Sequence, residues 1–251
     1  MQNGAGAPRG PRRRLRILLW DLDGTLAAWV GPGIVVALAG RFLRLLRPHA
    51  APLPALLAAG RAYLGALRNP GPRSNDAVFN ARLAAALRLP CDLPARLART
   101  LLADGAADDL IAAHIAAIPA ARELVAAVAA HGGVRQVVAT NPVMPSLFNR
   151  RRLELAGYDV AGCFVHVTGS ELHSGQKHRV AFYEQLLAQL GAAPGDCLMV
   201  GNDLAKDLVA KEAGIPMFLI ENAHTRRRGG PAGLAPDGSG DYDALRAWIL
   251  A

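Results

Sequence analysis

The sequence predicts an α/β fold in which helices cover both faces of a parallel β-sheet and an all-α subdomain is inserted. Short apolar segments alternate with helical segments, a pattern typical of parallel sheets. The apolar segments are near-continuous hydrophobic runs, as strands buried on both faces require. Residues 33–118 break this alternation, because they contain only helical patterns.

The elements of the sheet-forming part follow one another in a regular order. Strands are predicted over residues 16–20, 134–139, 163–168, 197–200 and 216–220. Helices are predicted over residues 120–131, 145–156, 177–190 and 204–213. A glycine follows each of these helices, which is a common signal for a helix end.

The inserted stretch carries five helical patterns, over residues 34–47, 53–67, 76–87, 93–102 and 107–118. We divide the chain into a flexible basic tail (1–14), a sheet-forming core (15–30 and 119–225), a helical subdomain (31–118), and a Gly/Pro-rich loop with a C-terminal helix (226–251). Ligands bind at the carboxyl ends of the strands in such sheets. The helical subdomain is therefore expected to lie over the site, and its polar turn at residues 73–76 either faces that site or is simply exposed.

Composition and charge exclude several classes of protein. The chain has 251 residues, of which 52% are hydrophobic, so it is too apolar for general disorder. The net charge of +8 comes from five arginines within residues 9–16 and from Arg226–Arg228, and the remainder is balanced. Such clusters can hold phosphate-rich partners. They lack interleaved aromatic residues that stack bases, so we interpret them as a solvated tail and loop and expect no nucleic-acid partner.

Cysteine usage and hydropathy indicate a cytoplasmic protein with no membrane partner. Cys91, Cys163 and Cys197 are odd in number and far apart, which excludes a disulfide framework and a cysteine-based zinc site. The apolar run at residues 17–20 ends at Asp21, and no segment approaches the ~20 apolar residues that span a bilayer. No feature of the sequence indicates the oligomeric state.

The chemistry is concentrated where the first predicted strand ends, at Asp21-Leu22-Asp23-Gly24-Thr25. Residues i and i+2 of an extended segment face the same way, so Asp21 and Asp23 are expected to project together. Two like charges that lie close together favour a bound cation. One carboxylate can act as a nucleophile and the other can transfer a proton. Gly24 lets the backbone turn and can offer its N–H to an anion, although an Asx-type turn alone would also explain the motif.

Polar residues follow the later strands as well. Thr140 and Asn141 follow the second strand and can donate to a phosphate oxygen or cap a helix. Lys177 is expected to open a helix, where an anionic partner would offset its unfavourable interaction with the helix dipole; an ordinary exposed lysine is the alternative. Asp203 and Asp207 lie four residues apart on one helix face, where they can bind Mg²⁺ or complement the dipole.

In this order the four segments resemble the motifs of the haloacid dehalogenase (HAD) superfamily, in its phosphatase branch. They are DLDGT at residues 21–25, Thr140, Lys177, and GNDLAKD at residues 201–207. The resemblance covers about residues 15–222, and the helical stretch between the first two motifs matches the position of the family's cap. It implies a Rossmann-like core and an enzyme that uses Mg²⁺.

The resemblance also implies roles for individual residues. Asp21 resembles the nucleophile that becomes phospho-aspartate, and Asp23 resembles the general acid and base. The phosphate is expected to contact Leu22, Gly24, Thr140, Asn141 and Lys177, with the backbone N–H groups near Leu22, Asp23 and Asn141 contributing. Mg²⁺ is expected among Asp21, Asp23, Asn202, Asp203 and Asp207. Asn202 replaces an acid of the family pattern, so either Asn202 or Asp203 is the principal ligand of the last motif.

The predicted function is therefore a Mg²⁺-dependent phosphatase that hydrolyses a small soluble phosphomonoester, a phosphorylated metabolite, through a phospho-aspartate intermediate. A haloacid dehalogenase shares the fold and the nucleophile, but it needs no proton donor at Asp23 because halide leaves unprotonated. A phosphomutase or another phosphotransferase keeps every motif. A non-catalytic protein that binds nucleic acid or phosphate through its arginine clusters is the last alternative.

Overall fold

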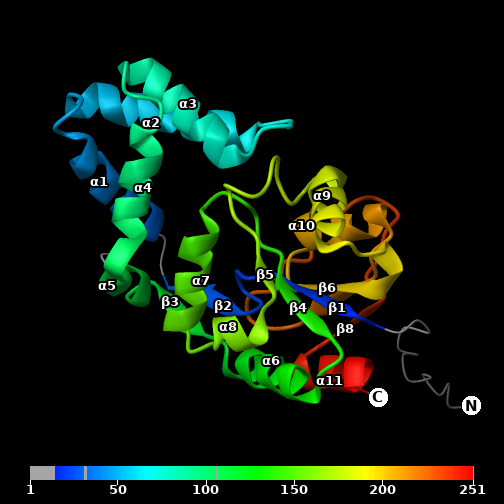
Figure 1. Ribbon diagram of the computed structural model, residues 1–251. Coiled ribbons are helices and arrows are strands. Elements are labelled where there is room, and N and C mark those ends of the chain that lie inside the picture. The colour runs from blue at the N-terminus through cyan, green and yellow to red at the C-terminus, as the bar shows by residue number, and fades with distance from the viewer. Residues whose placement is uncertain (1–14, 31–32, 106, 251) are drawn as a thin grey trace, which may run out of the picture.

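A computed structural model describes residues 15–30, 33–105 and 107–250, so the basic tail expected over 1–14 lies outside the described residues. Six parallel strands form one sheet in the order β5-β4-β1-β6-β7-β8 (Figure 1). Their bounds are β1 Ile17–Trp20, β4 Arg135–Val138, β5 His166–Val167, β6 Cys197–Gly201, β7 Met217–Ile220 and β8 Gly238–Gly240. Trp20 at the end of β1 pairs with Val138 on one side and Val200 on the other. The loops that follow these three strands therefore begin side by side.

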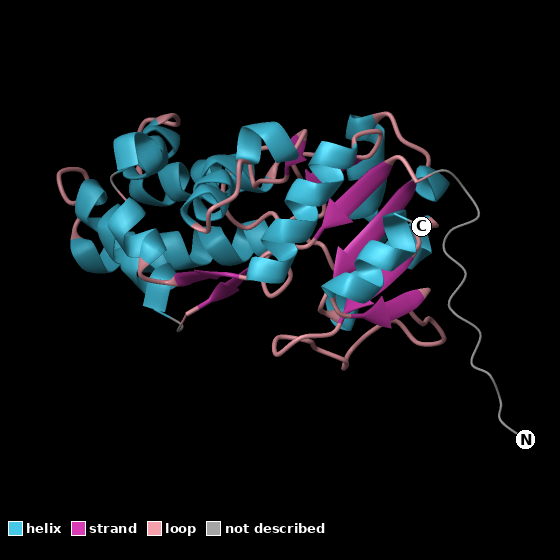
Figure 2. Ribbon diagram, turned by 90° about the horizontal axis from the view of Figure 1, so that it is seen from below, coloured by secondary structure: helices cyan, strands magenta, loops and turns pink. Residues whose placement is uncertain are grey.

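Helices cover both faces of the sheet, which confirms the predicted α/β architecture (Figure 2). Ile17 and Leu19 of β1 pack in one core cluster with α9 (Val180–Leu190). Leu18 and Trp20 point to the other face, where they share a cluster with α6 (Pro119–His131) and α11 (Tyr242–Leu250). The strict alternation along β1 explains why its whole sequence is apolar.

Five helices form a lobe beside the sheet, which we call the helical insertion (Figure 1). They are α1 Gly33–Leu46, α2 Pro52–Leu67, α3 Asn75–Leu87, α4 Leu93–Leu102 and α5 Asp108–Ala112. On α1 the buried residues Ile34, Leu38, Phe42 and Leu46 recur every four positions, so one face of this helix packs inward. Ser74 caps the start of α3, because its hydroxyl accepts a hydrogen bond from the Ala77 N–H.

The helix predicted over residues 107–118 is wrong in its second half. Helix α5 ends at Ala112, and β3 (Ile115–Ala117) pairs antiparallel with β2 (Ala27–Trp29), a strand that the sequence analysis does not predict. These are the two segments by which the chain enters and leaves the helical insertion. Their mutual pairing overrides the weak helical pattern of a short alanine-rich segment.

Four further elements differ from the prediction. Helix α9 begins at Val180, so Lys177 lies in a turn before the helix and the argument from the helix dipole does not apply to it. The helix predicted over 204–213 is α10 (Leu204–Asp207) followed by a 3₁₀ helix (Leu208–Ala213). The strand predicted over 163–168 is reduced to β5 after the short helix α8 (Val160–Cys163). Strand β8 was not predicted, because Gly238-Ser239-Gly240 has no hydrophobic pattern.

Asn75 at the start of α3 fastens the helical insertion to the core. Its Nδ2 donates to the carbonyls of Pro142 at 2.9 Å and Gly175 at 2.7 Å, and its Oδ1 accepts from the Gly175 N–H at 3.0 Å. Asn69 Nδ2 donates to the same Oδ1. The side chain is buried, and the two core loops it joins are those that follow β4 and β5. The turn at residues 73–76 therefore faces the core.

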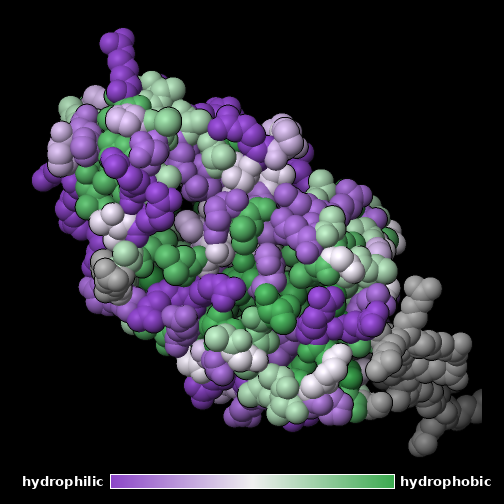
Figure 3. Space-filling model, in the orientation of Figure 1, coloured by the Kyte–Doolittle hydropathy of each residue, from purple (hydrophilic) through white to green (hydrophobic). Residues whose placement is uncertain are grey.

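Within residues 15–30, 33–105 and 107–250, no helix is long and apolar enough to cross a membrane. Hydrophobic residues are visible on the surface where the helical insertion, at upper left, meets the core (Figure 3).

We predict that Asn75→Ala lowers the free energy of unfolding by about 2–4 kcal/mol, because it leaves buried backbone groups of Pro142 and Gly175 without partners. Ser74→Ala is the matched control, since it removes only a helix cap and should cost about 1 kcal/mol. Urea unfolding measures both variants. Equal losses in the two variants would contradict the role assigned to Asn75.

Candidate active site

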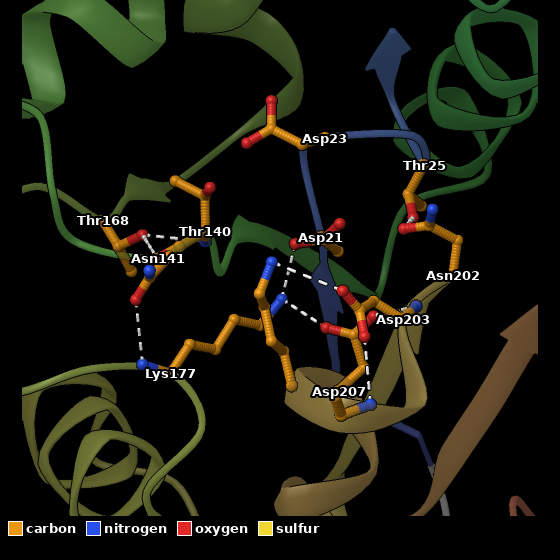
Figure 4. Close-up of polar contacts among 12 residues, drawn as sticks. Asp21, Asp23, Thr25, Thr140, Asn141, Thr168, Lys177, Asn202, Asp203 and Asp207 are labelled. Carbon is orange, nitrogen blue, oxygen red and sulfur yellow. Dashed lines mark hydrogen bonds and ion pairs between the residues drawn. The ribbon is translucent and has the colours of Figure 1, made fainter. Parts of the chain in front are cut away.

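The ammonium group of Lys177 lies at the centre of the site, and its side chain is completely buried. Its Nζ lies 2.6 Å from Asp21 Oδ1 and 2.6 Å from Asp207 Oδ1 (Figure 4). Asp21 follows β1, Asp207 ends α10 and Lys177 precedes α9, so three separate elements meet at this ion cluster. The structure thus brings together three of the residues predicted from the sequence.

Burial and charge shift the pKa values of this cluster. Burial raises the pKa of Asp21 to about 7; the Lys177 ammonium opposes this shift, and the carboxylates of Asp207 and Asp23 add to it. Burial acts to lower the pKa of Lys177, but the carboxylates of Asp207 and Asp21 outweigh it and the pKa is raised. Lys177 is therefore a fixed positive charge at neutral pH, beside a carboxyl group that titrates near neutrality.

The turn after Asp21 is held by three side chains from distant parts of the chain. The carbonyl of Gly24 accepts from Asn222 Nδ2 at 2.8 Å. The next two carbonyls accept from tyrosine hydroxyls: Thr25 from Tyr242 at 2.5 Å and Leu26 from Tyr158 at 2.8 Å. These three residues are not predictable from the sequence, because a hydrogen bond to a backbone carbonyl leaves no pattern along the chain.

Gly24 has a positive φ of 89°, and a Cβ there would lie 2.4 Å from Asn202 Nδ2, so only glycine fits the turn. Its N–H donates to the Ala27 carbonyl at 2.8 Å. The expectation that this N–H is offered to an anion is therefore wrong. The turn uses it internally, because the chain reverses direction between Leu22 and Ala27.

The spacing predicted that the side chains of Asp21 and Asp23 lie side by side. In the structure the side chain of Asp23 does not lie beside that of Asp21. It points away from Asp21 (Figure 4). Its carboxylate forms an ion pair with Arg152. The alternation of an extended strand ends before Asp23, because the chain turns there. Arg152 is itself buried, and its guanidinium carbon lies 3.8 Å from the ring centre of Trp29, a cation–π contact.

Arg152 is a residue that the sequence analysis missed, although a signal for it exists. It lies on α7 (Ser146–Leu155), whose buried face is formed by Phe148, Asn149, Arg152 and Leu153. Position 152 is one turn beyond Phe148, so the helical period places one arginine of the run at residues 150–152 on the apolar face. A buried arginine at such a position needs a charged partner, which the partly exposed carboxylate of Asp23 provides.

Hydrogen bonds from several elements hold the motif at residues 201–207 in place. Asn202 Oδ1 accepts from the Thr25 hydroxyl at 3.1 Å, and its Nδ2 donates to the His224 carbonyl at 2.7 Å. Asp203 caps α10 by accepting from the Ala205 N–H, and Asp207 Oδ2 accepts from the Asp203 N–H at 2.8 Å. A Cβ on Gly201 would lie 2.1 Å from Asp207 Oδ2, so the glycine makes room for that carboxylate.

The structure does not gather the five predicted metal ligands into one cluster. Among the described residues, no three His, Cys, Asp or Glu side chains are placed to hold a metal. Asp23 is turned to Arg152, and Asp207 faces Lys177. Asp21 and Asp203 remain at the ends of the adjacent strands β1 and β6 (Figure 4). Mg²⁺ takes one or two protein carboxylates and keeps several waters and substrate oxygens, so this smaller donor set fits it.

Thr140 and Asn141 hold the loops that surround the ion cluster. Thr140 is buried, and its N–H donates to Thr168 Oγ1 at 2.9 Å, while that hydroxyl donates back to the Thr140 carbonyl. Asn141 Oδ1 accepts from the Lys177 N–H at 3.0 Å. Thr168 is therefore a further residue of the site; the sequence signal was a polar residue at the end of a predicted strand.

Comparisons with known proteins identify the family of the chain. The sequence model of the haloacid dehalogenase-like hydrolases matches residues 15–214. A search of curated proteins gave no match.

Several solved structures share the fold. A HAD phosphatase from Thermococcus onnurineus is 19% identical with a TM-score of 0.52, covering 94% of this chain and 98% of its own. An L-2-haloacid dehalogenase from Xanthobacter autotrophicus is 14% identical with a TM-score of 0.53, with the same coverage. A magnesium-bound HAD hydrolase from Bacillus subtilis is 19% identical with a TM-score of 0.52, covering 95% and 100%. The family match spans most of the chain, so this protein belongs to the haloacid dehalogenase-like hydrolases.

Proposed function

We propose that the protein is a phosphatase that hydrolyses a small phosphomonoester through a phospho-aspartate on Asp21. The observation that carries this proposal is the Asp21 carboxylate beside the fully buried ammonium of Lys177. Asp21 attacks phosphorus, and the bond from phosphorus to the alcohol oxygen breaks. Asp23 gives that oxygen a proton, then takes one from the water that cleaves the acyl phosphate. For this step Asp23 turns from Arg152 toward the leaving group.

Fixed donors stabilise the charge that develops on the phosphoryl oxygens. Lys177 supplies a positive charge that its two carboxylate contacts keep in place. The Thr140 hydroxyl and the backbone N–H groups of Leu22, Asp23 and Asn141 complete the proposed set, while Gly24 contributes the turn alone. Preorganised donors of this kind are the main contribution of a protein to phosphoryl transfer.

Mg²⁺ is the proposed cofactor. Asp21 and Asp203 would hold it through their carboxylates and Asp23 through its backbone carbonyl, while the amide of Asn202 braces the Thr25 turn. When bound, the ion neutralises negative charge where the phosphate meets Asp21. The magnesium bound to the Bacillus subtilis relative supports this choice.

The helical insertion is the proposed cap, with residues 31–118 as its extent. Asn75 ties it to the loops after β4 and β5, which carry Thr140 and Lys177. A cap held at these loops can exclude water while the phospho-aspartate forms.

Haloacid dehalogenation is the second candidate, and one observation favours it. Asp23 forms an ion pair with Arg152 and does not lie beside Asp21. A dehalogenase needs no proton donor beside Asp21, because halide leaves unprotonated. The Xanthobacter autotrophicus relative is an enzyme of this kind.

We predict that Asp21→Asn lowers phosphate release by at least about a thousandfold, because the amide cannot attack phosphorus. Phosphate release from a panel of phosphomonoesters, with Mg²⁺ and with EDTA, measures this effect. Asp92→Asn is the matched control, since Asp92 is exposed and its ion-pair partner among the described residues is Arg96; it should keep full activity. Full activity in Asp21→Asn would contradict the covalent mechanism.

Asp23→Asn should separate the two candidate functions. We expect turnover of an alkyl phosphate to fall by about 10²–10⁴-fold, because its alkoxide needs a proton. With p-nitrophenyl phosphate, whose leaving group is a stable anion, a burst of one p-nitrophenol per enzyme should persist in stopped-flow traces. Unchanged release of halide from 2-haloalkanoic acids by this variant would instead establish dehalogenation.

Without Mg²⁺, the free energy of unfolding should depend on pH through Asp21. Its pKa is about 7 in the folded protein against an ordinary value of 3.8. The folded state holds this proton more tightly, so the stabilisation is complete below about pH 4 and is lost as pH rises through about 7, a loss of up to about 4 kcal/mol.

Urea unfolding in EDTA at pH 4, 5.5 and 8 measures this effect as the difference between wild type and Asp21→Asn. His173, whose pKa burial lowers to about 4, acts in the opposite direction but equally in both proteins. A difference that does not change with pH would refute the assignment.

A further inference from the structure

A cavity of about 310 Å³ lies between the helical insertion and the core. Helices α1 to α4 form most of its wall, and the loops after β4 and β5 close it on the core side. Hydrophobic residues gather on the surface at this junction (Figure 3). Ligand pockets have volumes of ~300–1,000 Å³, so the cavity has the size of a small-molecule site.

The two core loops that line the cavity also carry residues of the candidate active site. Pro142 lines it and follows Asn141, whose side chain holds the backbone of Lys177. Gln176 lines it and directly precedes Lys177. Asn75, which bonds to both loops, is also in the wall. A molecule with its phosphate beside Lys177 can therefore extend into this cavity.

The wall is apolar and carries no positive charge. Leu38, Phe42, Leu101 and Met144 are typical of the side chains that form it. None of the described residues that line it is a lysine, arginine or histidine. The one acid is Asp76, and burial raises the pKa of its carboxyl group. A second phosphate would lose its water there without gaining a cationic partner.

The wall has a few polar residues, Tyr63, Asn75, Asp76, Ser170 and Gln176, and of these Gln176 directly precedes Lys177. Gln176 is buried, and its Nε2 has no hydrogen-bond partner among the described residues. A buried amide N–H without an acceptor is costly, so this donor indicates where a ligand oxygen would lie. The cavity therefore suits a molecule with one oxygen at its inner end and hydrocarbon along the rest.

We propose that the substrate is the phosphomonoester of an apolar alcohol, with its phosphate at Asp21 and Lys177 and its hydrocarbon chain in this cavity. The inference rests on the proposed phosphatase activity and specifies its substrate class. Gln176 donates to the oxygen that joins the chain to phosphorus. A water-sized group fills ~30 Å³, so the cavity holds about ten such groups.

A series of n-alkyl phosphates from ethyl to dodecyl, below their micelle concentrations, tests the proposal. We expect kcat/KM to rise about two- to fourfold per added methylene, because each buried methylene adds apolar transfer free energy. The rise should end near ten carbons, when the cavity is full. Glucose 6-phosphate and a nucleoside monophosphate should be poorer substrates than hexyl phosphate.

Two variants connect this series to the cavity. Gly60 lies in the wall, and an added Cβ meets no atom within 4 Å, so Gly60→Phe should fold and flatten the response to chain length. Gly40→Phe is the matched control, since Gly40 is also a helical glycine with free space but lies outside the wall; its response should match wild type. Phe79→Ala enlarges the cavity and should move the plateau to longer chains.

The outcomes separate this inference from the phosphatase proposal. Phosphatase activity with a flat alkyl series, or with a preference for sugar phosphates, overturns the inference alone. If no phosphate is released at all, calorimetric titration of the same alkyl phosphates still tests the cavity: affinity that rises with chain length and weakens in Gly60→Phe supports it, and equal affinity overturns it. If activity and affinity do not depend on alkyl chain length and Gly60→Phe changes the oligomeric state, the cavity would be a contact between copies of the chain. That result would also overturn the inference.

Discussion

The buried ammonium of Lys177 is the interaction on which the rest of the site depends. A charge removed from water is costly unless it is paired, and here two carboxylates, Asp21 and Asp207, contact the same Nζ. Each partner has its own support: Asn141 holds the Lys177 backbone, and Gly201 makes room for Asp207. Removing Lys177 would leave two carboxylates in the core without a positive charge beside them. The cluster therefore sets both the stability of the sheet's carboxyl edge and the electrostatics that a phosphoryl group would meet.

The helical insertion depends on the same loops. Asn75 connects α3 to the two loops beside Thr140 and Lys177, so a displacement of the helices would disturb the ion cluster. Asp23 is the other movable part, because its carboxylate is partly exposed and bound to Arg152. Closure of the cap and rotation of Asp23 would together complete the arrangement that general acid catalysis requires. If the proposed substrate class is right, the apolar cavity between α1–α4 and the core would make the helical insertion a selector of hydrocarbon and not only a lid.

The sequence alone predicted the parallel sheet, the inserted helices and the residues that meet at Lys177, because these follow from continuous apolar runs and from polar residues at strand ends. The predictions were wrong or incomplete where contacts between distant parts of the chain determine the local structure. Pairing with β2 turned residues 115–117 into a strand, and β8 has too few side chains to form a pattern. The Gly24 N–H, which was expected to bind an anion, donates to a carbonyl within its own turn. The same turn directs the side chain of Asp23 to Arg152 and away from Asp21. Arg152 and the hydroxyls of Tyr158 and Tyr242 were missed because their partners lie more than a hundred residues away.

The central claim is that a phosphoryl group is carried on Asp21, and mass spectrometry during turnover tests it most directly. The wild-type enzyme is mixed with an alkyl phosphate and Mg²⁺, quenched in acid within one turnover and reduced with borohydride, which converts an acyl phosphate to an alcohol. We predict that peptide sequencing finds the side chain of Asp21 reduced to that of homoserine, and that the same treatment without substrate leaves it unchanged. Turnover of phosphate with an unmodified Asp21 at every quench time would contradict the account.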